Sequence, residues 1–231
     1  PDLLSVTLYQ KASDMSQSGR DNIPLAFWRQ VPNMVQAVRD VAPYGIAYKT
    51  VSYQGRKLNG AIVGADESLA RVMNIELAQG YFVSFTESFE HYCVIGAGVA
   101  KQLRQHGVID PIGKSLRIGQ AIYTVIGVAK PWKENAFFNE DVNQAVIVPI
   151  AGMPLINKDS KINHAVLLLK PNNDIDVVIA DINQILSQQA PKLSAFIRSA
   201  KQIIVSMESQ GRIFTLLLAV IGSISLLVGG I

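Results

Sequence analysis

The chain has 231 residues, with 21 lysines and arginines against 18 aspartates and glutamates, so its formal net charge is +3. Apolar types make up 49% and charged types 17%, which excludes a disordered chain, because disorder needs low hydrophobicity and high charge. A small surplus without a long Lys or Arg run also argues against nucleic-acid binding. A chain of this length can bury one working core or two small ones.

The single cysteine, Cys93, excludes an intrachain disulfide and the usual thiolate zinc sites, which need at least two thiols. It lies between Tyr92 and Val94 in an apolar stretch, which predicts a buried structural thiol instead of a nucleophile. The chain opens on Pro1 without a basic stretch followed by an apolar one, so we interpret it as an excised piece or a processed product.

The N-terminal part of the chain predicts a strand, a helix, two strands and a second helix. The strands are indicated by alternating or short apolar runs, and the helices by apolar residues at helical spacing. Pro32 is expected in the first turn of the first helix and Pro43 just after its end. In chain order these elements are expected at residues 4–8, 34–42, 46–53, 58–63 and 67–78.

The middle of the chain predicts short strands with one brief helix at 99–105, and the strands are expected at 92–95, 115–118, 122–128 and 145–150. Residues 130–143 form a polar stretch with Trp132, Phe137 and Phe138 embedded in it. One interpretation is an exposed loop whose aromatic residues contact a partner. The alternative, which we favour, is that the three rings fold into the core.

The last third returns to the first pattern, with a strand at 165–169 and a helix after Asn172 or Asn173. The simplest architecture is α+β in two lobes. Residues 1–85 with 160–194 form an α+β lobe from both chain ends, and residues 86–159 form an inserted β-rich lobe. Residues 195–212 are then expected to form a stalk helix.

Residues 213–231 read IFTLLLAVIGSISLLVGGI, a run without a single charged side chain. As a helix it reaches about 28 Å, close to the roughly 30 Å of bilayer hydrocarbon. We predict a transmembrane helix that the native polypeptide continues. A buried core helix is the alternative, but such helices are seldom apolar on every side. The representative membrane-spanning residues are Ile213, Phe214, Leu218, Gly222, Leu226 and Ile231.

Two short runs resemble nucleotide-binding motifs, but their spacing or the element that follows excludes each of them. The run Gly96–Ala97–Gly98 follows a strand, as in a dinucleotide fingerprint, but Lys101 occupies the place of the third glycine. We interpret it as a tight strand-to-helix turn. The run Gly113–Lys114–Ser115 precedes a strand, whereas a P-loop opens a helix. The three histidines lie far apart. We therefore expect no enzyme, and no catalytic, cofactor or metal-binding residue in this chain.

Several blocks together resemble the extracytoplasmic domain of MacB-type ABC transporter permeases. The resemblance runs from Leu58 to Ile231 and its blocks occur in the family's order. They read GAIVGAD, VMNIELAQGYF, CVIGAGVAKQL, PIGKSLRIGQAIYTVIGVAK, AVIVPI and QGRIFTLLLAVIGSISLLVGGI.

The resemblance implies a two-lobed extracytoplasmic domain, with a porter-like βαβ lobe and an inserted lobe, before the second membrane helix of a permease subunit. It implies a homodimer or pseudo-dimer in the lipid of the inner membrane, with both lobes in the periplasm. It further implies a separate cytoplasmic ABC ATPase that binds ATP and Mg²⁺, so that no cofactor is expected in this chain, and an adaptor with an outer-membrane channel as further partners.

The function implied is the transmission of ATP-driven motion that drives export of a substrate from the periplasm. Two alternatives stay open. One is a permease of the same superfamily that releases lipoproteins or regulates cell-wall hydrolases. The other is a sensor or binding module anchored in the membrane by one helix.

Overall fold

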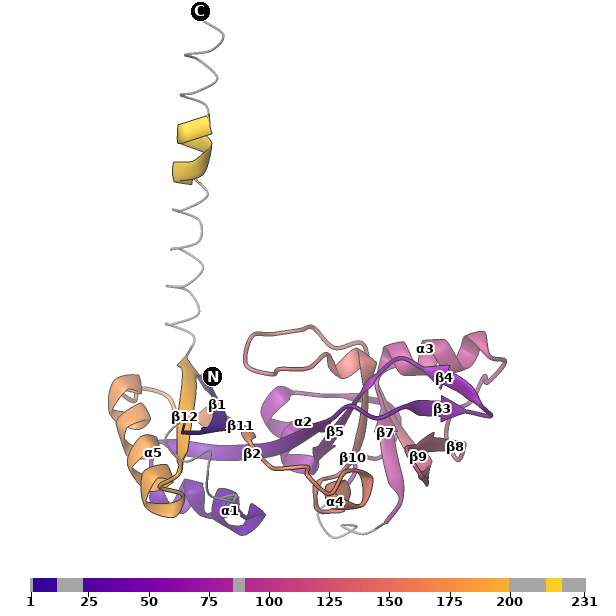
Figure 1. Cartoon of the computed structure of the whole chain (residues 1–231), viewed down its shortest axis with the longest axis horizontal. Helices are drawn as coiled ribbons and strands as arrows, with labels where there is room; N and C mark the ends of the chain where they lie inside the picture. Colours follow the sequence, from indigo (N-terminus) through magenta and orange to yellow (C-terminus); the bar gives the residue numbers. More distant parts are fainter. Residues whose placement is uncertain (1, 12–22, 85–89, 200–214, 222–231) are drawn as a thin grey trace, which may run out of the picture.

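The computed structural model describes residues 2–11, 23–84, 90–199 and 215–221. The architecture is α+β, as predicted, and is built on one mixed sheet with helices packed against it. The strand order is β12-β1-β11-β2-β5-β10-β7-β9-β8-β3-β4, with β6 beside β9. Figure 1 shows the sheet dividing into two lobes that lie side by side.

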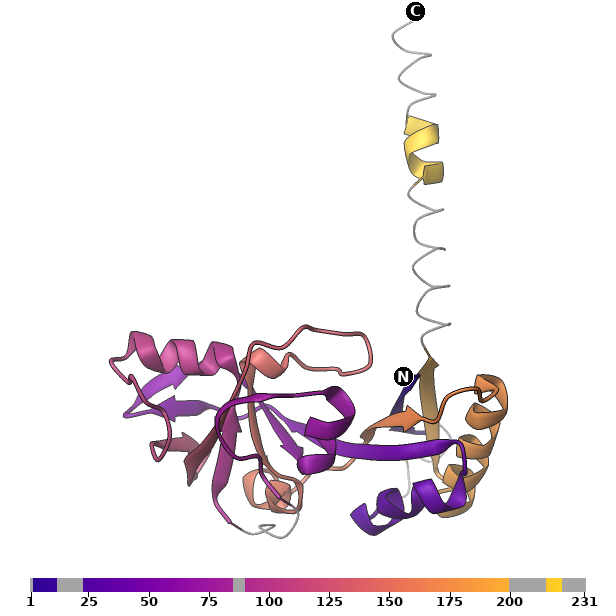
Figure 2. The same cartoon turned by 180° about the vertical axis from the view of Figure 1, so that it is seen from behind.

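The first lobe combines elements from both ends of the chain, as Figure 2 shows from behind. Its strands pair antiparallel, and the helices α1 and α5 cover one face of them. Its elements are β1 (Leu3–Gln10), α1 (Leu25–Met34), β2 (Val38–Ala47), β11 (His164–Leu169), α5 (Ile175–Gln189) and β12 (Leu193–Ser199).

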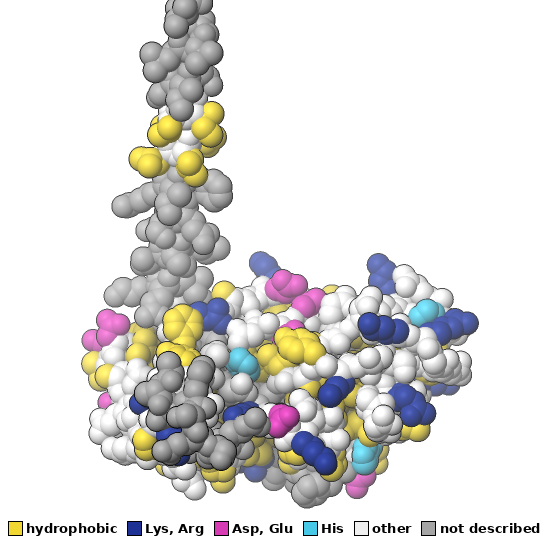
Figure 3. Space-filling view, viewed as in Figure 1, with side chains coloured by type: hydrophobic (Ala, Val, Ile, Leu, Met, Phe, Trp, Pro, Cys, Tyr) yellow, Lys and Arg dark blue, Asp and Glu magenta, His cyan; other side chains and the backbone are white. Residues whose placement is uncertain are grey.

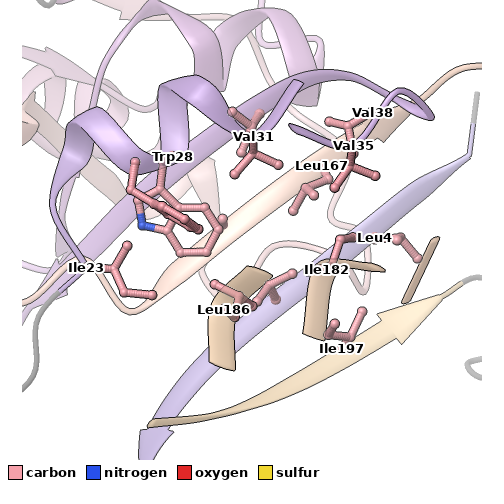
Figure 4. Packing of buried hydrophobic residues seen from close by; sticks show 14 of the residues in the cluster. Leu4, Ile23, Trp28, Val31, Val35, Val38, Leu167, Ile182, Leu186 and Ile197 are labelled. Atoms are coloured by element: carbon pink, nitrogen blue, oxygen red, sulfur yellow. The ribbon is translucent and has the colours of Figure 1, made fainter. Parts of the chain in front are cut away.

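Alternating apolar residues form the core of the first lobe. Trp28 of α1 and Leu186 of α5 turn toward the sheet, where they pack with Leu4 and Leu167 (Figure 4). All four are almost fully buried, and side chains of this size each contribute about 1.5–3 kcal/mol by leaving water. Both helices are therefore fixed by their apolar faces.

The second lobe contains the other strands, among which β5–β10 and β7–β9 pair in parallel. Both central residues of the β3–β4 turn, Gln54 and Gly55, have positive φ, as a two-residue type I′ hairpin requires. Its strands are β3 (Val51–Tyr53), β4 (Arg56–Leu58), β5 (Ala61–Ala65), β6 (Leu77–Gly80), β7 (Tyr92–Ile95), β8 (Ser115–Ile118), β9 (Ala121–Ala129) and β10 (Ala145–Pro149). Its helices are α2 (Glu67–Met73), α3 (Ala97–Gln105) and α4 (Met153–Ile156), with 3-10 turns η3 (Val142–Gln144) and η4 (Ile150–Gly152).

Strand β2 joins the two lobes. Six of its first seven residues pair with β11, whereas Gly45–Ala47 pair with β5 of the second lobe. One continuous strand therefore belongs to both halves of the sheet, and a displacement of either half is carried along its backbone.

The predicted helix at 34–42 is wrong. The helix lies earlier, at Leu25–Met34, and Val38–Ala47 form strand β2. Both faces of β2 are covered, so seven of its ten residues are buried and the alternation that marks a strand is lost. Pro43 is tolerated in this strand because only β11 pairs with it there, and β5 begins pairing at Gly45.

The predicted stalk helix is wrong at its start, because residues 193–199 form β12. This strand pairs antiparallel with β1 over seven residues, from Leu4–Ser199 to Gln10–Leu193. The backbone N–H and C=O groups on this edge of β1 form hydrogen bonds with β12, and a helix starting at Ala195 would leave them without these partners. Residues 200–212 of the predicted stalk lie outside the described residues.

The lobe division differs from the prediction at its first boundary. Strand β5 pairs in parallel with β10, so it belongs to the second lobe although it precedes the predicted insertion. Helix α2 contacts both β2 and β11 and so bridges the lobes. No local pattern indicates this, because Ala61 of β5 pairs with Ala145, which lies inside the predicted insertion.

Candidate functional site

The connection between β9 and β10 reaches from the second lobe onto the first. We call residues 130–141 the crossover loop. Its base is fixed by Asn143, whose amide accepts from the Trp132 backbone N–H and donates to the Trp132 carbonyl, both at 2.8 Å. The Trp132 indole Nε1 donates to the Met73 carbonyl at 3.0 Å, at the end of α2. These bonds give the loop a defined path.

The three aromatic residues of the crossover loop pack inward to different extents. Phe138 is 5% exposed and lies 4.7 Å, centroid to centroid, from the ring of Tyr44 on β2. Trp132 and Phe137 are half-buried against the same cluster, and Trp132 meets Phe138 edge to face at 6.1 Å. Phe138 therefore belongs to the core, as the alternative interpretation expects. A partner contact by Trp132 and Phe137 stays a prediction.

The tip of the crossover loop meets a row of side chains on the first lobe. Thr7 on β1 lies opposite His164 on β11, and His164 lies opposite Tyr44 on β2. Residues directly opposite one another in a sheet point to the same face. Arg198 on β12 points to this face too, because Phe196, two residues earlier, is paired with Thr7. The register thus brings four polar side chains from four strands together.

Asn139 contacts all four of them. Its side-chain nitrogen lies 3.1 Å from His164 Nδ1 and 3.5 Å from Thr7 Oγ1. Its side-chain oxygen accepts from Arg198 Nη2 at 2.6 Å, and its backbone N–H donates to the Tyr44 hydroxyl at 3.3 Å. The next residue, Glu140, accepts from the hydroxyl of Tyr48 at 2.6 Å.

We call Asn139, Thr7, Tyr44, His164 and Arg198 the interlobe cluster. Burial raises the pKa of Tyr44 to about 12, so its phenol stays protonated. Burial, and then the positive charge of Arg198, lower the pKa of His164. A neutral imidazole stacked 5.1 Å from the Tyr44 ring can accept from Asn139, which a protonated one cannot. Protonation of His164 would therefore break its bond to Asn139, whereas the bonds of Asn139 to Arg198 and Tyr44 would still link the lobes.

Sequence reasoning missed the interlobe cluster. Its members are common residue types that lie far apart in the sequence, and Thr7 and His164, for example, are 157 residues apart. No motif links them, and only the strand register places them on one face.

Other residues singled out in the sequence take structural places. Cys93 is fully buried in β7, and burial raises the pKa of its thiol, so it stays a thiol at neutral pH. A Cβ at Gly96 would overlap the Val142 carbonyl oxygen, so the turn into α3 packs directly on η3. Within the described ranges, no cluster of three or more His, Cys, Asp or Glu side chains could hold a metal ion.

Most of the predicted membrane helix lies outside the described residues, including Ile213, Phe214, Gly222, Leu226 and Ile231. Residues 215–221 are helical, and Leu218 is 69% exposed. Figure 3 shows hydrophobic side chains on the visible face of this turn. Across the parts of the chain that the structure describes, no helix is both long and apolar enough to cross a bilayer.

A family model described as the MacB-like periplasmic core domain matches residues 1–185. The chain belongs to this family. Among its relatives is the macrolide export ATP-binding/permease protein MacB of Neisseria meningitidis serogroup A, which is 26% identical over 194 residues. That alignment covers 84% of this chain and 30% of the relative. The MacB of Bdellovibrio bacteriovorus is 24% identical over 229 residues, covering 94% of this chain and 34% of the relative.

Solved structures share the MacB-like fold. The periplasmic region of MacB from Actinobacillus actinomycetemcomitans matches with a TM-score of 0.69 at 14% identity, over 89% of this chain and 92% of that one. The extracellular domain of the ABC-type transporter YknZ from Gram-positive bacteria matches with a TM-score of 0.64 at 14% identity, over 83% and 99%. The chain shares the fold of these domains, as expected of a MacB-like periplasmic core domain, and it spans about a third of the length of the curated relatives.

Proposed function

We propose that this domain transmits ATP-driven motion from the membrane to the periplasmic lobes and so drives export of a substrate from the periplasm. The observation that carries the proposal is the place of β12. It ends at Ser199, directly before the segment that leads to the apolar run 213–231, and it is hydrogen-bonded to β1 along its whole length.

A paired strand transmits displacement because sliding it would break every bond of the ladder at once. Movement of β12 therefore moves the first lobe as a unit. From there two connections lead to the second lobe, namely the backbone of β2 and the interlobe cluster around Asn139. The two connections lie on different elements, so they resist rotation between the lobes as well as separation.

The proposal includes the assembly that such a motor needs. A second permease subunit, as a homodimer or pseudo-dimer in the inner membrane, would supply the surface against which the lobes move. A cytoplasmic ABC ATPase would bind ATP and Mg²⁺ and supply the motion. A periplasmic adaptor and an outer-membrane channel would receive the cargo. The Neisseria relative is a macrolide export protein, and this likeness supports a role in transport.

Spin labels test this transmission without a known substrate. In the full-length permease with its ATPase, Ile109→Cys provides a labelling site, because Ile109 is 88% exposed and the native Cys93 is fully buried. We expect the distance between the two labels of a dimer to change when ATP is trapped. Four glycines inserted after Ser199 should abolish that change.

The same insertion after Pro171, in the exposed turn between β11 and α5, is the matched control and should leave the change intact. Two results would contradict the proposal. One is a distance that ATP trapping does not alter in the parent protein. The other is a full response that survives the insertion after Ser199, because a flexible linker cannot carry a directed displacement.

A further inference from the structure

The end of the second lobe carries an unusual concentration of positive charge. Residues 48–60 and 97–122, which we call the cationic end, contain seven Lys or Arg residues and one acid, Asp110. The rest of the chain contains fourteen basic and seventeen acidic residues, so the sign of its charge is opposite. Figure 3 shows the basic side chains gathered over the end that carries α3, β3, β4 and β8. The seven are Lys49, Arg56, Lys57, Lys101, Arg104, Lys114 and Arg117.

All seven cations are exposed, and none of them has a carboxylate partner within the described part of the chain. The ion pairs among the described residues lie elsewhere, such as Arg71 with Asp40 at 3.1 Å and Lys130 with Glu76 at 2.7 Å. Like charges repel one another and destabilise the fold, most of all at low salt, because at physiological salt the Debye length is only about 8 Å. The cationic end thus has an electrostatic cost that nothing within the described chain offsets.

The strand register divides these cations between two faces of the lobe. Lys57 and Arg117 both lie opposite Ser52, so they share one face, about 10 Å apart at two strand spacings. The alternate residues Leu58, Val51 and Ile118 are buried on the other face together with Leu103 of α3. Lys101 and Arg104 therefore lie on the far side of α3, and the edge strand β4 lies between the two groups.

Protection of the sheet edge explains only part of this charge. Lysines on an edge strand prevent unwanted pairing between chains. Only Arg56 and Lys57 lie on β4, whereas the others belong to α3, β8 and the adjoining loops. A bilayer surface explains the rest poorly, because a flat membrane cannot meet both faces of the lobe at once.

We propose that the cationic end docks an acidic polypeptide segment of a partner protein, which passes around the β4 edge and contacts both faces. A groove of about 340 Å³ between Tyr48–Val51 and Lys57–Gly60 lies along this route. At about 3.3 Å per residue, roughly ten extended residues reach from Arg117 past β4 to Arg104. The inference goes beyond the proposed function, because this binding needs no nucleotide and holds whether or not the domain transmits motion.

A fluorescein-labelled decapeptide of glutamate is the probe for this site. Its anisotropy is measured with the 231-residue chain in a nonionic detergent, at low and at physiological salt. We expect binding that weakens steeply with salt. Each charge-reversal pair, Lys57→Glu with Arg117→Glu and Lys101→Glu with Arg104→Glu, should lower the affinity about tenfold, because exposed ion pairs each contribute modestly and reversal adds repulsion.

The matched control is Lys158→Glu with Lys170→Glu, two exposed lysines outside the cationic end, which should lower affinity less than twofold. Thermal unfolding checks that each variant folds. The two charge-reversal variants of the cationic end should unfold at no lower temperature than the parent, because they relieve repulsion between its like charges. An equal loss of affinity in the control would overturn the proposal. So would a loss in only one of the two charge-reversal variants of the cationic end, because a segment that passes around the β4 edge contacts both faces. Micelles containing phosphatidylglycerol provide the last test. If they displaced the peptide and bound more tightly than it at the same residues, the cationic end would bind a lipid surface and not a protein partner.

Discussion

Phe138 shows how one side chain fixes a long loop. It is buried between Tyr44 and Trp132, at ring distances of 4.7 and 6.1 Å, where the crossover loop meets the first lobe. We expect Phe138→Ala to lower the free energy of unfolding by about 3–5 kcal/mol, because it removes both transfer energy and packing. Urea denaturation followed by circular dichroism measures this.

The neighbouring Phe137 is the control for that experiment, because it is only half-buried. Phe137→Ala should cost clearly less stability. If both variants kept the parent's stability and export failed only with Phe138→Ala, the ring would act at a partner surface and the core interpretation would be wrong.

We expect the stability of the fold to depend on pH through His164 in the interlobe cluster. Tyr44, Thr7, Asn139 and Arg198 face it from β2, β1, the crossover loop and β12, and Glu140 lies beside them. Burial and Arg198 lower its pKa, so the unfolded chain binds a proton below about pH 6.5 where the folded chain does not yet. Stability is then complete above that pH and falls as the pH drops toward the folded pKa.

The test compares unfolding by urea at pH 7.5, 6.5 and 5.5 in the parent and in His164→Gln, whose amide can still accept a hydrogen bond. We expect the parent to lose more stability between pH 6.5 and 5.5 than the variant does. The protection of the crossover-loop amides against hydrogen exchange, relative to the intrinsic rate at each pH, should fall over the same interval in the parent alone. Identical pH profiles in both proteins would show that His164 does not couple the loop to the sheet.

At the scale of elements, close backbone approach explains the glycines that imitate a nucleotide motif. A Cβ at Gly96 would overlap the backbone oxygens of both Val142 and Asn143. These atoms belong to η3, which also anchors the base of the crossover loop. Gly96 therefore permits the contact between α3 and η3.

We expect Gly96→Ala to destabilise the second lobe by roughly 2 kcal/mol or more, because the backbone of η3 must shift to admit the methyl group. Lys101→Ala, an exposed position on the same helix, should change stability by less than about 0.5 kcal/mol. Calorimetry of both variants measures the difference. Tight ATP or NAD binding that is lost in Gly96→Ala would instead support the dinucleotide interpretation.

Elements with one clear neighbour could be predicted from the sequence, and elements shared between neighbours could not. Strand β1 and the helices α2 and α5 follow from periodicity, since the apolar residues of each gather on one side. Strand β2 is covered on both faces, so its apolar residues also fit helical spacing. Strand β12 needs β1, at the opposite end of the chain, to become a strand. The interlobe cluster depends on both of these strands, which is why no local pattern indicates it.

At the scale of the whole molecule, the boundary at Ser199 separates two kinds of surface. The lobes before it have polar exteriors and three buried apolar clusters, whereas the described turn after it exposes Leu216, Leu217 and Leu218. Such a surface is expected of a helix whose solvent is lipid, where no face needs to be polar. The apolar run 213–231 should then decide how the chain behaves in water.

We expect the chain shortened after Ser199 to be monodisperse without detergent, since β12 is retained and both lobes keep their cores. The 231-residue chain should aggregate unless detergent or lipid is present. Size-exclusion chromatography with light scattering compares the two, and Leu218→Glu with Leu226→Glu, which charges the run without shortening it, should restore solubility to the full chain. A full chain that stayed monomeric in plain buffer would show that the run packs against its own lobes, and motion could not then be carried to them from the membrane through β12.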